Sequence, residues 1–138
     1  MKKILIVSAI YYMLIATQMS REAKTALDNS KTLTRRKQNI NYKLIHVPGV
    51  FEIPVVISKN IKKYDGFIAL GCVIKGETPH FDFISSATTN AIMKLSIEHR
   101  KPIGNGIITC LNMKQAQARS KTKGIEAAKA VLSVLKIF

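Results

Sequence analysis

A short polar segment carries the residue types in this chain that could do chemistry. It reads KGETPH at positions 75–80 and follows an apolar run over residues 67–73. Gly76 would let the backbone approach a ligand closely, and N–H groups at a helix start, with the Thr78 hydroxyl, could bind an anion. Because a histidine side chain titrates near neutrality, His80 could transfer protons. The alternatives are a helix cap for Thr78 and an ordinary polar surface position for His80.

Two further groups of residues could bind parts of a substrate. Arg119 ends a short predicted helix, and Lys121 and Lys123 follow it, so these cations could clamp a phosphate. The alternative is a set of solvated cations that complement the helix dipole. Tyr11 and Tyr12 follow an apolar run near the start of the chain. They could stack on a planar ring or be ordinary rim aromatics.

The elements that must position these residues alternate between strand and helix. Apolar runs predict strands over residues 3–9, 42–47, 66–73 and 106–111, and helical spacing predicts helices over 14–29, 81–98, 113–119 and 124–135, with one more after Pro48-Gly49. This order predicts an α/β, flavodoxin-like fold, a three-layer αβα sandwich with a four-stranded parallel sheet, in one domain over residues 1–138. Ligands of such sheets bind beyond the carboxyl ends of the strands, where the polar segment and the two tyrosines fall.

The chain is strongly basic. Its 138 residues carry a formal net charge of +14 at pH 7, and 47% of them are hydrophobic, which is enough for a core. Nucleic acid would be attracted through counterion release, but the only dense triplet is Arg35-Arg36-Lys37, in a predicted surface connection over residues 30–41. No RNP-like strand, zinc-ligand spacing or recognition-helix pattern accompanies it. We therefore favour a lysine-rich solvated surface and do not expect a nucleic-acid partner.

Cysteine usage and the N-terminal run bear on location. Cys72 and Cys110 belong to no C-x-x-C pair and lie near the ends of predicted strands. We expect free, partly buried thiols in a cytoplasmic protein and no metal site. The basic start and apolar run over residues 1–16 resemble a signal peptide, but the run is shorter than the about 20 residues that span a bilayer. We therefore predict a buried first strand and no membrane association.

Three segments of the chain resemble those of lumazine synthases. They are VPGVFEIP at positions 47–54, GCVIKGETPHFD at 71–82, and the stretch from Gly106 to Arg119. The first two motifs are long and specific, and the resemblance covers nearly the whole chain. It implies the penultimate step of riboflavin biosynthesis, with no metal or organic cofactor. In that step 5-amino-6-(ribitylamino)uracil and 3,4-dihydroxy-2-butanone 4-phosphate give 6,7-dimethyl-8-ribityllumazine, phosphate and water.

The same resemblance implies roles for individual residues. His80 matches a histidine that moves protons, and Arg119 matches an arginine that binds the phosphate, helped by Gly76, Glu77 and Thr78. The residues matched to the pyrimidine and ribityl part of the site are Tyr11, Val50, Phe51, Glu52, Val73, Ile74, Asn105 and Lys123. In the implied mechanism, a pyrimidine amine attacks the ketone to form a Schiff base, phosphate is eliminated, and the ring closes with a second loss of water.

The chain departs from the family pattern at three places. Tyr11-Tyr12 stands where Phe-Asn is common, Asn105 stands where phenylalanine is common, and the segment between Arg119 and Gly124 is shorter than usual. Because sites of the family lie between subunits, the resemblance implies a homo-oligomer, and we expect a pentamer. The sequence leaves open a decamer or a shell of twelve pentamers. A basic nucleic-acid-binding domain and a shell protein without catalysis are the alternatives from other classes.

Overall fold

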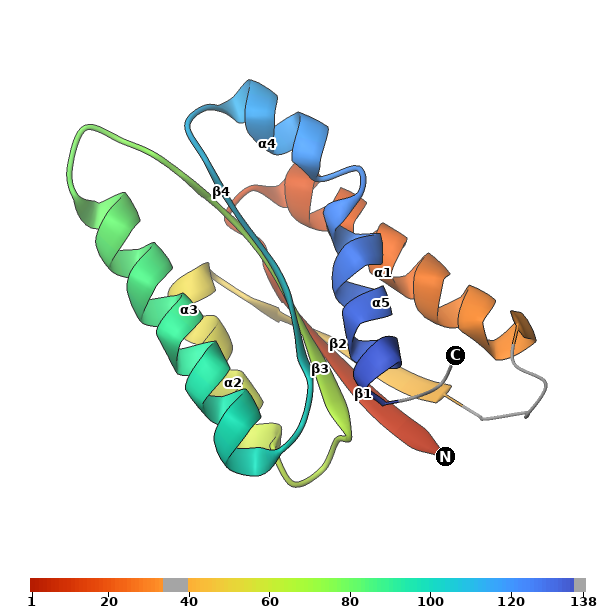
Figure 1. The fold of residues 1–138 in the computed structure, drawn as a ribbon. Helices are drawn as coiled ribbons and strands as arrows, with labels where there is room; N and C mark the ends of the chain where they lie inside the picture. Colours follow the sequence, from red (N-terminus) through yellow and green to blue (C-terminus); the bar gives the residue numbers. More distant parts are fainter. Residues whose placement is uncertain (34–39, 136–138) are drawn as a thin grey trace.

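The computed structural model describes residues 1–33 and 40–135 and has one sheet between two layers of helices (Figure 1). The strands are β1 (Lys2–Ala9), β2 (Ile40–Val47), β3 (Gly66–Ile74) and β4 (Ile103–Cys110). The helices are α1 (Met13–Leu33), the 3-10 helix η1 (Val50–Glu52), α2 (Ile53–Asn60), α3 (His80–His99), α4 (Met113–Arg119) and α5 (Lys123–Val134). The strands pair in parallel in the order β2-β1-β3-β4, which confirms the predicted four-stranded parallel sheet and flavodoxin-like α/β fold.

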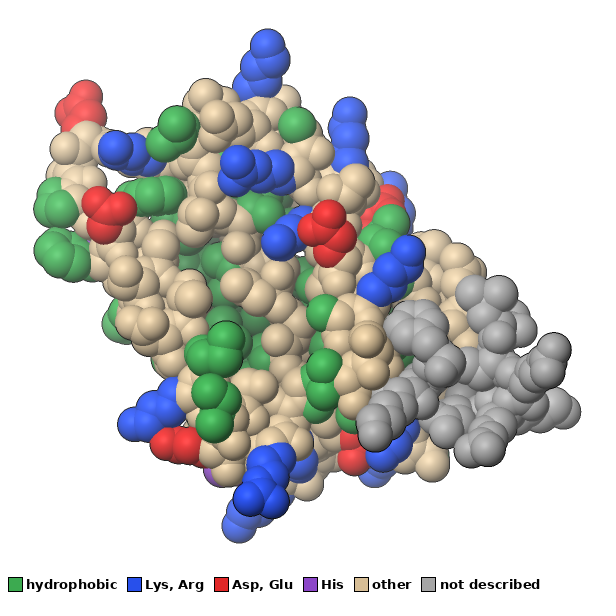
Figure 2. Space-filling model, viewed as in Figure 1, with side chains coloured by type: hydrophobic (Ala, Val, Ile, Leu, Met, Phe, Trp, Pro, Cys, Tyr) green, Lys and Arg blue, Asp and Glu red, His purple; other side chains and the backbone are tan. Residues whose placement is uncertain are grey.

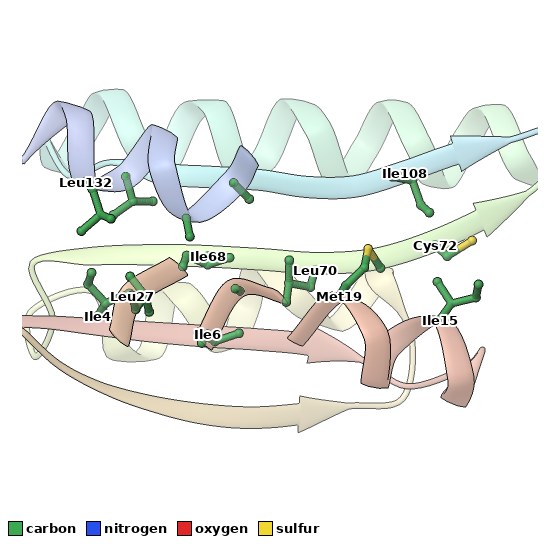
Figure 3. Close-up of a cluster of buried hydrophobic side chains, with 14 of the residues drawn as sticks. Ile4, Ile6, Ile15, Met19, Leu27, Ile68, Leu70, Cys72, Ile108 and Leu132 are labelled. Atoms are coloured by element: carbon green, nitrogen blue, oxygen red, sulfur yellow. The ribbon is translucent and has the colours of Figure 1, made fainter. Parts of the chain in front are cut away.

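Both faces of the sheet are buried, which explains the continuous apolar runs. Successive β1 side chains point to opposite faces, so Ile4 and Ile6 join one apolar cluster and Leu5 and Val7 join the other. Helices α1 and α5 cover the first face, where Leu27 and other side chains meet the strands (Figure 3). Helices α2 and α3 cover the second face (Figure 1). The two layers hold the carboxyl ends of all four strands at one edge.

Two glycines allow α5 to approach its neighbours closely. A Cβ atom on Gly124 would lie 2.2 Å from the Met19 carbonyl oxygen in α1. A Cβ atom on Gly104 would lie 2.2 Å from the Ala127 carbonyl oxygen. Because both obstacles are backbone atoms, no side chain fits at either position. These contacts fix α5, and with it the segment that joins α5 to Arg119.

Most elements lie within two residues of their predicted bounds, and β2, for example, begins at Ile40 rather than at residue 42. Two boundaries differ by three residues or more. Helix α1 continues past residue 29, because Ser30 is buried and its hydroxyl donates to the Leu27 carbonyl at 2.6 Å. Strand β4 begins at Ile103 rather than at residue 106. Its pairing with β3 starts where Ile103 lies opposite Phe67, and it continues through Gly104 and Gly106. Arg35-Arg36-Lys37 lies outside the described residues.

The apolar N-terminal run forms a buried strand, as predicted. In the described ranges, no helix combines the length and the apolar character that a membrane span requires. Lysine and arginine side chains are dispersed over the face seen in Figure 2, with carboxylates between them. Among the described residues, Lys94 forms an ion pair with Glu98 at 3.8 Å, and Lys123 forms one with Glu126 at 3.7 Å.

Arg100 ends α3 in a left-handed backbone conformation, with φ 53° and ψ 42°. Such a conformation brings Cβ close to the following carbonyl, and glycine removes that cost. Arg100→Gly is therefore expected to stabilise the protein by about 0.5–1 kcal/mol, seen as a rise of a few degrees in the thermal midpoint. Lys94→Gly, within the same helix, should instead lower stability by about 1 kcal/mol. A lower midpoint for Arg100→Gly would contradict this account.

Candidate active site

A cavity of about 320 Å³ opens at the carboxyl edge of the sheet, where β1, β2 and β3 end. Its lining comes from the turns that follow these strands and from the first residues of α3. The lining residues are Tyr11, Tyr12, Gly49, Val50, Cys72, Val73, Ile74, Gly76, Thr78, His80, Phe81 and Ile84. The cavity therefore brings together seven of the residues predicted from the sequence, namely Tyr11, Val50, Val73, Ile74, Gly76, Thr78 and His80.

The polar segment over residues 75–80 lies at the rim of this cavity, and its side chains are available to a ligand. The Lys75 N–H donates to the Cys110 carbonyl at 2.8 Å, which ties the start of the segment to β4. Helix α3 is capped by Pro79 without a side-chain bond, so the capping role considered for Thr78 is wrong. In the described part of the chain, the side chains of Glu77, Thr78 and His80 are exposed and form no hydrogen bond. They and the positive end of the α3 dipole are free to meet a ligand.

The turn after β2 is held by its own carboxylate. Glu52 Oε1 accepts a hydrogen bond from the Gly49 N–H at 3.0 Å, which closes η1 as a capping box. This turn buries Val50 beside the cavity and leaves the Phe51 ring 63% exposed. Phe51 and Glu52 therefore border the cavity without lining it. The Glu52 carboxylate therefore fixes the backbone of this turn.

Two tyrosines with different environments stand at one side of the cavity. Their ring centroids lie 4.9 Å apart at an interplanar angle of 79°, an edge-to-face contact. The Tyr12 ring packs against the core, and burial together with Cys72 raises the pKa of its phenol above the ordinary value. Tyr12 is therefore a neutral hydroxyl that can donate a hydrogen bond. Tyr11 is 77% exposed, so its ring can accept a planar ligand.

Arg119 lies at a second cavity, of about 330 Å³, on the β4 side of the sheet. Its guanidinium donates to the Thr109 carbonyl at 2.9 Å, which orients the side chain and leaves further N–H donors for a ligand. The helix that carries it begins at a reciprocal cap: Asn112 Oδ1 accepts from the Gln115 N–H at 2.9 Å, and Gln115 Oε1 accepts from the Leu111 N–H at 2.8 Å. Lys123 lines the same cavity.

One chain does not bring all the predicted residues together. His80 and Arg119 line separate cavities, and Asn105 lines neither of the two. Asn105 lies opposite Ala69 in the sheet, five residues before the end of β4, which is about 17 Å along the strand. Its side chain is exposed on the edge strand. The predicted residues that line the two cavities thus form two groups. The His80 half consists of Tyr11, Val50, Val73, Ile74, Gly76, Thr78 and His80, and the Arg119 half consists of Arg119 and Lys123.

Some cavity residues were missed by the sequence reasoning. Phe81 and Ile84 line the cavity from the first turn of α3, and their spacing of three residues on one helix face was an available signal. Cys72 also lines it. Because side chains alternate along β3, Cys72 lies on the same strand face as Ile74, which was predicted for the site. This two-residue spacing could have identified Cys72 from the sequence.

Comparison with known proteins agrees with the geometry. The whole chain, residues 1–138, matches the family model described as 6,7-dimethyl-8-ribityllumazine synthase. The chain belongs to this family. The 6,7-dimethyl-8-ribityllumazine synthase of Agrobacterium fabrum is 39% identical over 145 residues, covering 97% of this chain and 93% of that protein. The synthase of Bartonella henselae is 44% identical over 118 residues, covering 80% of this chain and 76% of that protein. The resemblance noted in the motifs is thereby confirmed.

The two cysteines of this lumazine synthase family member are free and buried, as predicted. Burial, with a smaller effect of the Cys110 thiol, raises the pKa of Cys72 from an ordinary 9.0 to about 12. The folded state therefore favours the protonated thiol. This contribution to stability is complete below pH 9 and is lost as pH rises toward 12.

The raised pKa makes Cys72 unreactive in the folded protein, because the thiolate is the nucleophile. Alkylation by iodoacetamide at pH 8 is expected to be at least about tenfold slower in native protein than in urea-unfolded protein. Mass spectrometry of the Cys72 peptide over time measures both rates. Equal rates in the two states would contradict the burial argument.

Proposed function

We propose that this chain catalyses the condensation of 5-amino-6-(ribitylamino)uracil with 3,4-dihydroxy-2-butanone 4-phosphate. The products are one lumazine, one phosphate and two water molecules. One water is lost when the Schiff base forms and the other when the ring closes. The single observation that carries the proposal is the cavity that His80 and the two tyrosines line together, in a chain of the lumazine synthase family. Positioning two substrates side by side supplies much of the rate in a condensation of this kind.

The His80 half binds the pyrimidine. The uracil ring stacks on the exposed face of Tyr11, and Val73 and Ile74 contact it from the end of β3. The ribityl chain runs along the turn of Val50, Phe51 and Glu52. The closed geometry of that turn, with Glu52 bonded to Gly49, supports this assignment because its backbone is held in one conformation. His80 transfers the protons that amine addition and water loss require.

The phosphate lies between the polar segment and Arg119. Gly76 and the N–H groups before α3 face one side of it, with Glu77 and Thr78 beside them. Arg119 supplies a planar guanidinium that can bind phosphate oxygens in pairs. This clamp stabilises the charge that develops as phosphate departs.

A second copy of the chain completes each site. The separation of the His80 and Arg119 halves supports this arrangement, because one chain leaves each half open to solvent. Asn105 and Lys123 then reach the pyrimidine from the neighbouring chain, with Arg119. Large apolar side chains exposed on α3 also support assembly: Phe83 at 69%, Met93 at 59% and Ile97 at 68%. We propose a homopentamer in the cytoplasm, where the two free thiols would stay reduced.

Gly76→Ala is expected to raise the KM for the phosphate substrate by about tenfold without lowering the thermal midpoint. A Cβ atom there would meet nothing within 4 Å, and the Gly76 backbone is not left-handed, so the fold accepts alanine. The missing side chain of Gly76 matters for activity only if the phosphate substrate approaches the backbone of this residue closely. Gly104→Ala is the contrasting variant and should unfold, because its Cβ would meet backbone. An unchanged KM for Gly76→Ala would remove this loop from the phosphate site.

The proposed function is tested by mixing the purified protein with both substrates and following the absorbance and fluorescence of the lumazine. We expect product well above the uncatalysed background. Light scattering on the same sample gives the number of chains per particle. A folded oligomer without acceleration would overturn the proposed reaction and favour a shell protein that lacks catalysis.

A further inference from the structure

A cavity that plays no part in the proposed reaction lies at the amino ends of the strands, opposite the carboxyl ends where the candidate active site lies. It has a volume of about 510 Å³, within the range of small-molecule sites. Its lining residues are Lys3, Asn41, Tyr42, Lys43, Lys62, Lys63 and Tyr64. They come from the first residues of β1 and β2 and from the loop between α2 and β3. Because Lys3 lies six residues before the end of β1, it is about 20 Å from the carboxyl end of that strand. We call it the basic cavity.

The backbone around the basic cavity is fixed. The Asp65 N–H donates to the Lys3 carbonyl at 2.7 Å, and Asp65 Oδ2 accepts from the Lys3 N–H at 2.8 Å. Lys3 is also in register with Asn41 of β2. The three segments that supply the cavity are therefore joined by sheet pairing and by this double contact. The lysine stems extend from anchored positions, which limits how far their ammonium groups can separate.

Positive charge in the basic cavity is not balanced within the described chain. Lys3, Lys43, Lys62 and Lys63 bring four ammonium groups to one cavity, and in the described residues none of them forms an ion pair or a side-chain hydrogen bond. Two carboxylates, those of Asp65 and Asp28, contact residues of the cavity and offset at most two of the four positive charges. Asp65 accepts from the Lys3 backbone, and Asp28 accepts from the Tyr42 hydroxyl at 2.9 Å. Four like charges around one hollow repel one another, and a bound polyanion would offset that repulsion.

Two tyrosines make the basic cavity more than a patch of lysines. Tyr64 is half-buried and its ring contacts Phe67 edge to face, with centroids 6.0 Å apart. Tyr42 is half-buried and held by Asp28 through its hydroxyl. Both rings are therefore fixed in place. The Tyr64 ring packs on the same face of the sheet as Leu5 and Ile45 and offers a flat surface and a polar tip beside the ammonium groups, whereas the Tyr42 ring packs on the α1 face. Asn41 adds an amide.

We propose that the basic cavity is a binding site for a small molecule that carries two or more linked phosphates. The ammonium groups of Lys3, Lys43, Lys62 and Lys63 bind the phosphate oxygens as point charges. Two sources share this chemistry, inorganic polyphosphate and a nucleoside di- or triphosphate. In the second case Tyr64 contacts the base or sugar. This site is independent of the proposed condensation, because none of its residues lies at the carboxyl edge.

Calorimetric titration of the full-length protein tests the proposal, with sodium tripolyphosphate, ATP, AMP and adenosine as probes. We expect saturable binding of tripolyphosphate and ATP at one site per chain, weaker binding of AMP and no binding of adenosine. Tighter binding of ATP than of tripolyphosphate would assign the ligand to the nucleotides, and equal binding would assign it to inorganic polyphosphate. Absence of saturable binding of both would overturn the proposal.

Paired variants separate the basic cavity from the general charge of the chain. Lys43→Gln/Lys63→Gln should weaken tripolyphosphate binding by about tenfold or more while lumazine formation continues at the normal rate. Lys94→Gln/Lys129→Gln removes the same charge from α3 and α5 and should change the affinity by less than about twofold. An equal loss in both pairs would assign binding to non-specific charge. An oligonucleotide that competes with tripolyphosphate equally well in the two double variants would lead to the same conclusion.

Arg119→Ala is the control for tripolyphosphate binding at the active site. It should leave tripolyphosphate binding intact, because Arg119 lines a different cavity. Loss of binding in Arg119→Ala, with no loss in Lys43→Gln/Lys63→Gln, would overturn the proposal and place the phosphates at the active site.

Discussion

Arg119→Ala is expected to raise the KM for 3,4-dihydroxy-2-butanone 4-phosphate by about a hundredfold and the KM for the pyrimidine by less than about threefold. The guanidinium donates to the Thr109 carbonyl at 2.9 Å and to the Cys110 sulfur at 4.0 Å, so its remaining N–H groups keep a fixed direction. Alanine removes the only group in the Arg119 half that can bind phosphate oxygens in a planar, paired way. Steady-state kinetics with each substrate varied in turn measures the two constants.

Arg119→Lys separates charge from shape. It keeps a cation at the end of α4 but loses the planar fork, so its KM should fall between those of the parent and Arg119→Ala. Because the parent side chain also bonds to Thr109, the thermal midpoint of each variant must be measured. Equal increases in the KM of both substrates would contradict the clamp.

Mixing the two impaired variants, His80→Ala and Arg119→Ala, tests whether the halves belong to different chains. A ring assembled from His80→Ala and Arg119→Ala chains has junctions where an intact His80 half meets an intact Arg119 half. In a random one-to-one mixture about a quarter of the junctions are of this kind, so activity should return toward that fraction. No recovery after unfolding and reassembly together would place both residues in one chain's site.

His80→Ala is expected to lower kcat by about tenfold to a thousandfold, with little change in either KM. The side chain reaches the cavity from the first residue of α3, is exposed, and makes no hydrogen bond in the described part of the chain. Its removal therefore takes away proton transfer without disturbing the fold. Presteady-state mixing of the two substrates, together with steady-state kinetics, measures the effect on turnover.

His99→Ala is the matched control, because His99 is exposed at the far end of the same helix and should leave kcat unchanged. An unchanged kcat for His80→Ala would remove this residue from the mechanism. A rise in KM at constant kcat would make it a binding residue instead.

Much of the fold could be predicted from the sequence because the signals are local. The run over residues 4–7 is apolar without interruption since both faces of the sheet are covered, and that pattern is present in four consecutive residues. Alternation of such runs with helical spacing implies parallel strands. Element ends were less predictable. Ser30 reads as a polar stop, yet it is buried in α1, and Gly104 reads as a break, yet it is paired within β4.

The residues of the candidate site were also found from the sequence, because the motifs are contiguous. Positions 75–80 follow β3 directly, so the topology alone sends them to the carboxyl edge. What the sequence could not decide is which of these groups face one another. The capping role considered for Thr78 depended on backbone angles at Pro79, and the edge-to-face contact of Tyr11 with Tyr12 depended on packing around the β1–α1 turn.

The sequence by itself determined the order of strands and helices and the family, and it supplied the residues proposed for the site, because each of these depends on neighbours in the chain. Only the tertiary structure decided that His80 and Arg119 line separate cavities and that four lysines from three segments surround another. Those facts depend on distances between residues far apart in the chain. Sheet pairing, and the close approach of α5 at Gly104 and Gly124, fix those distances.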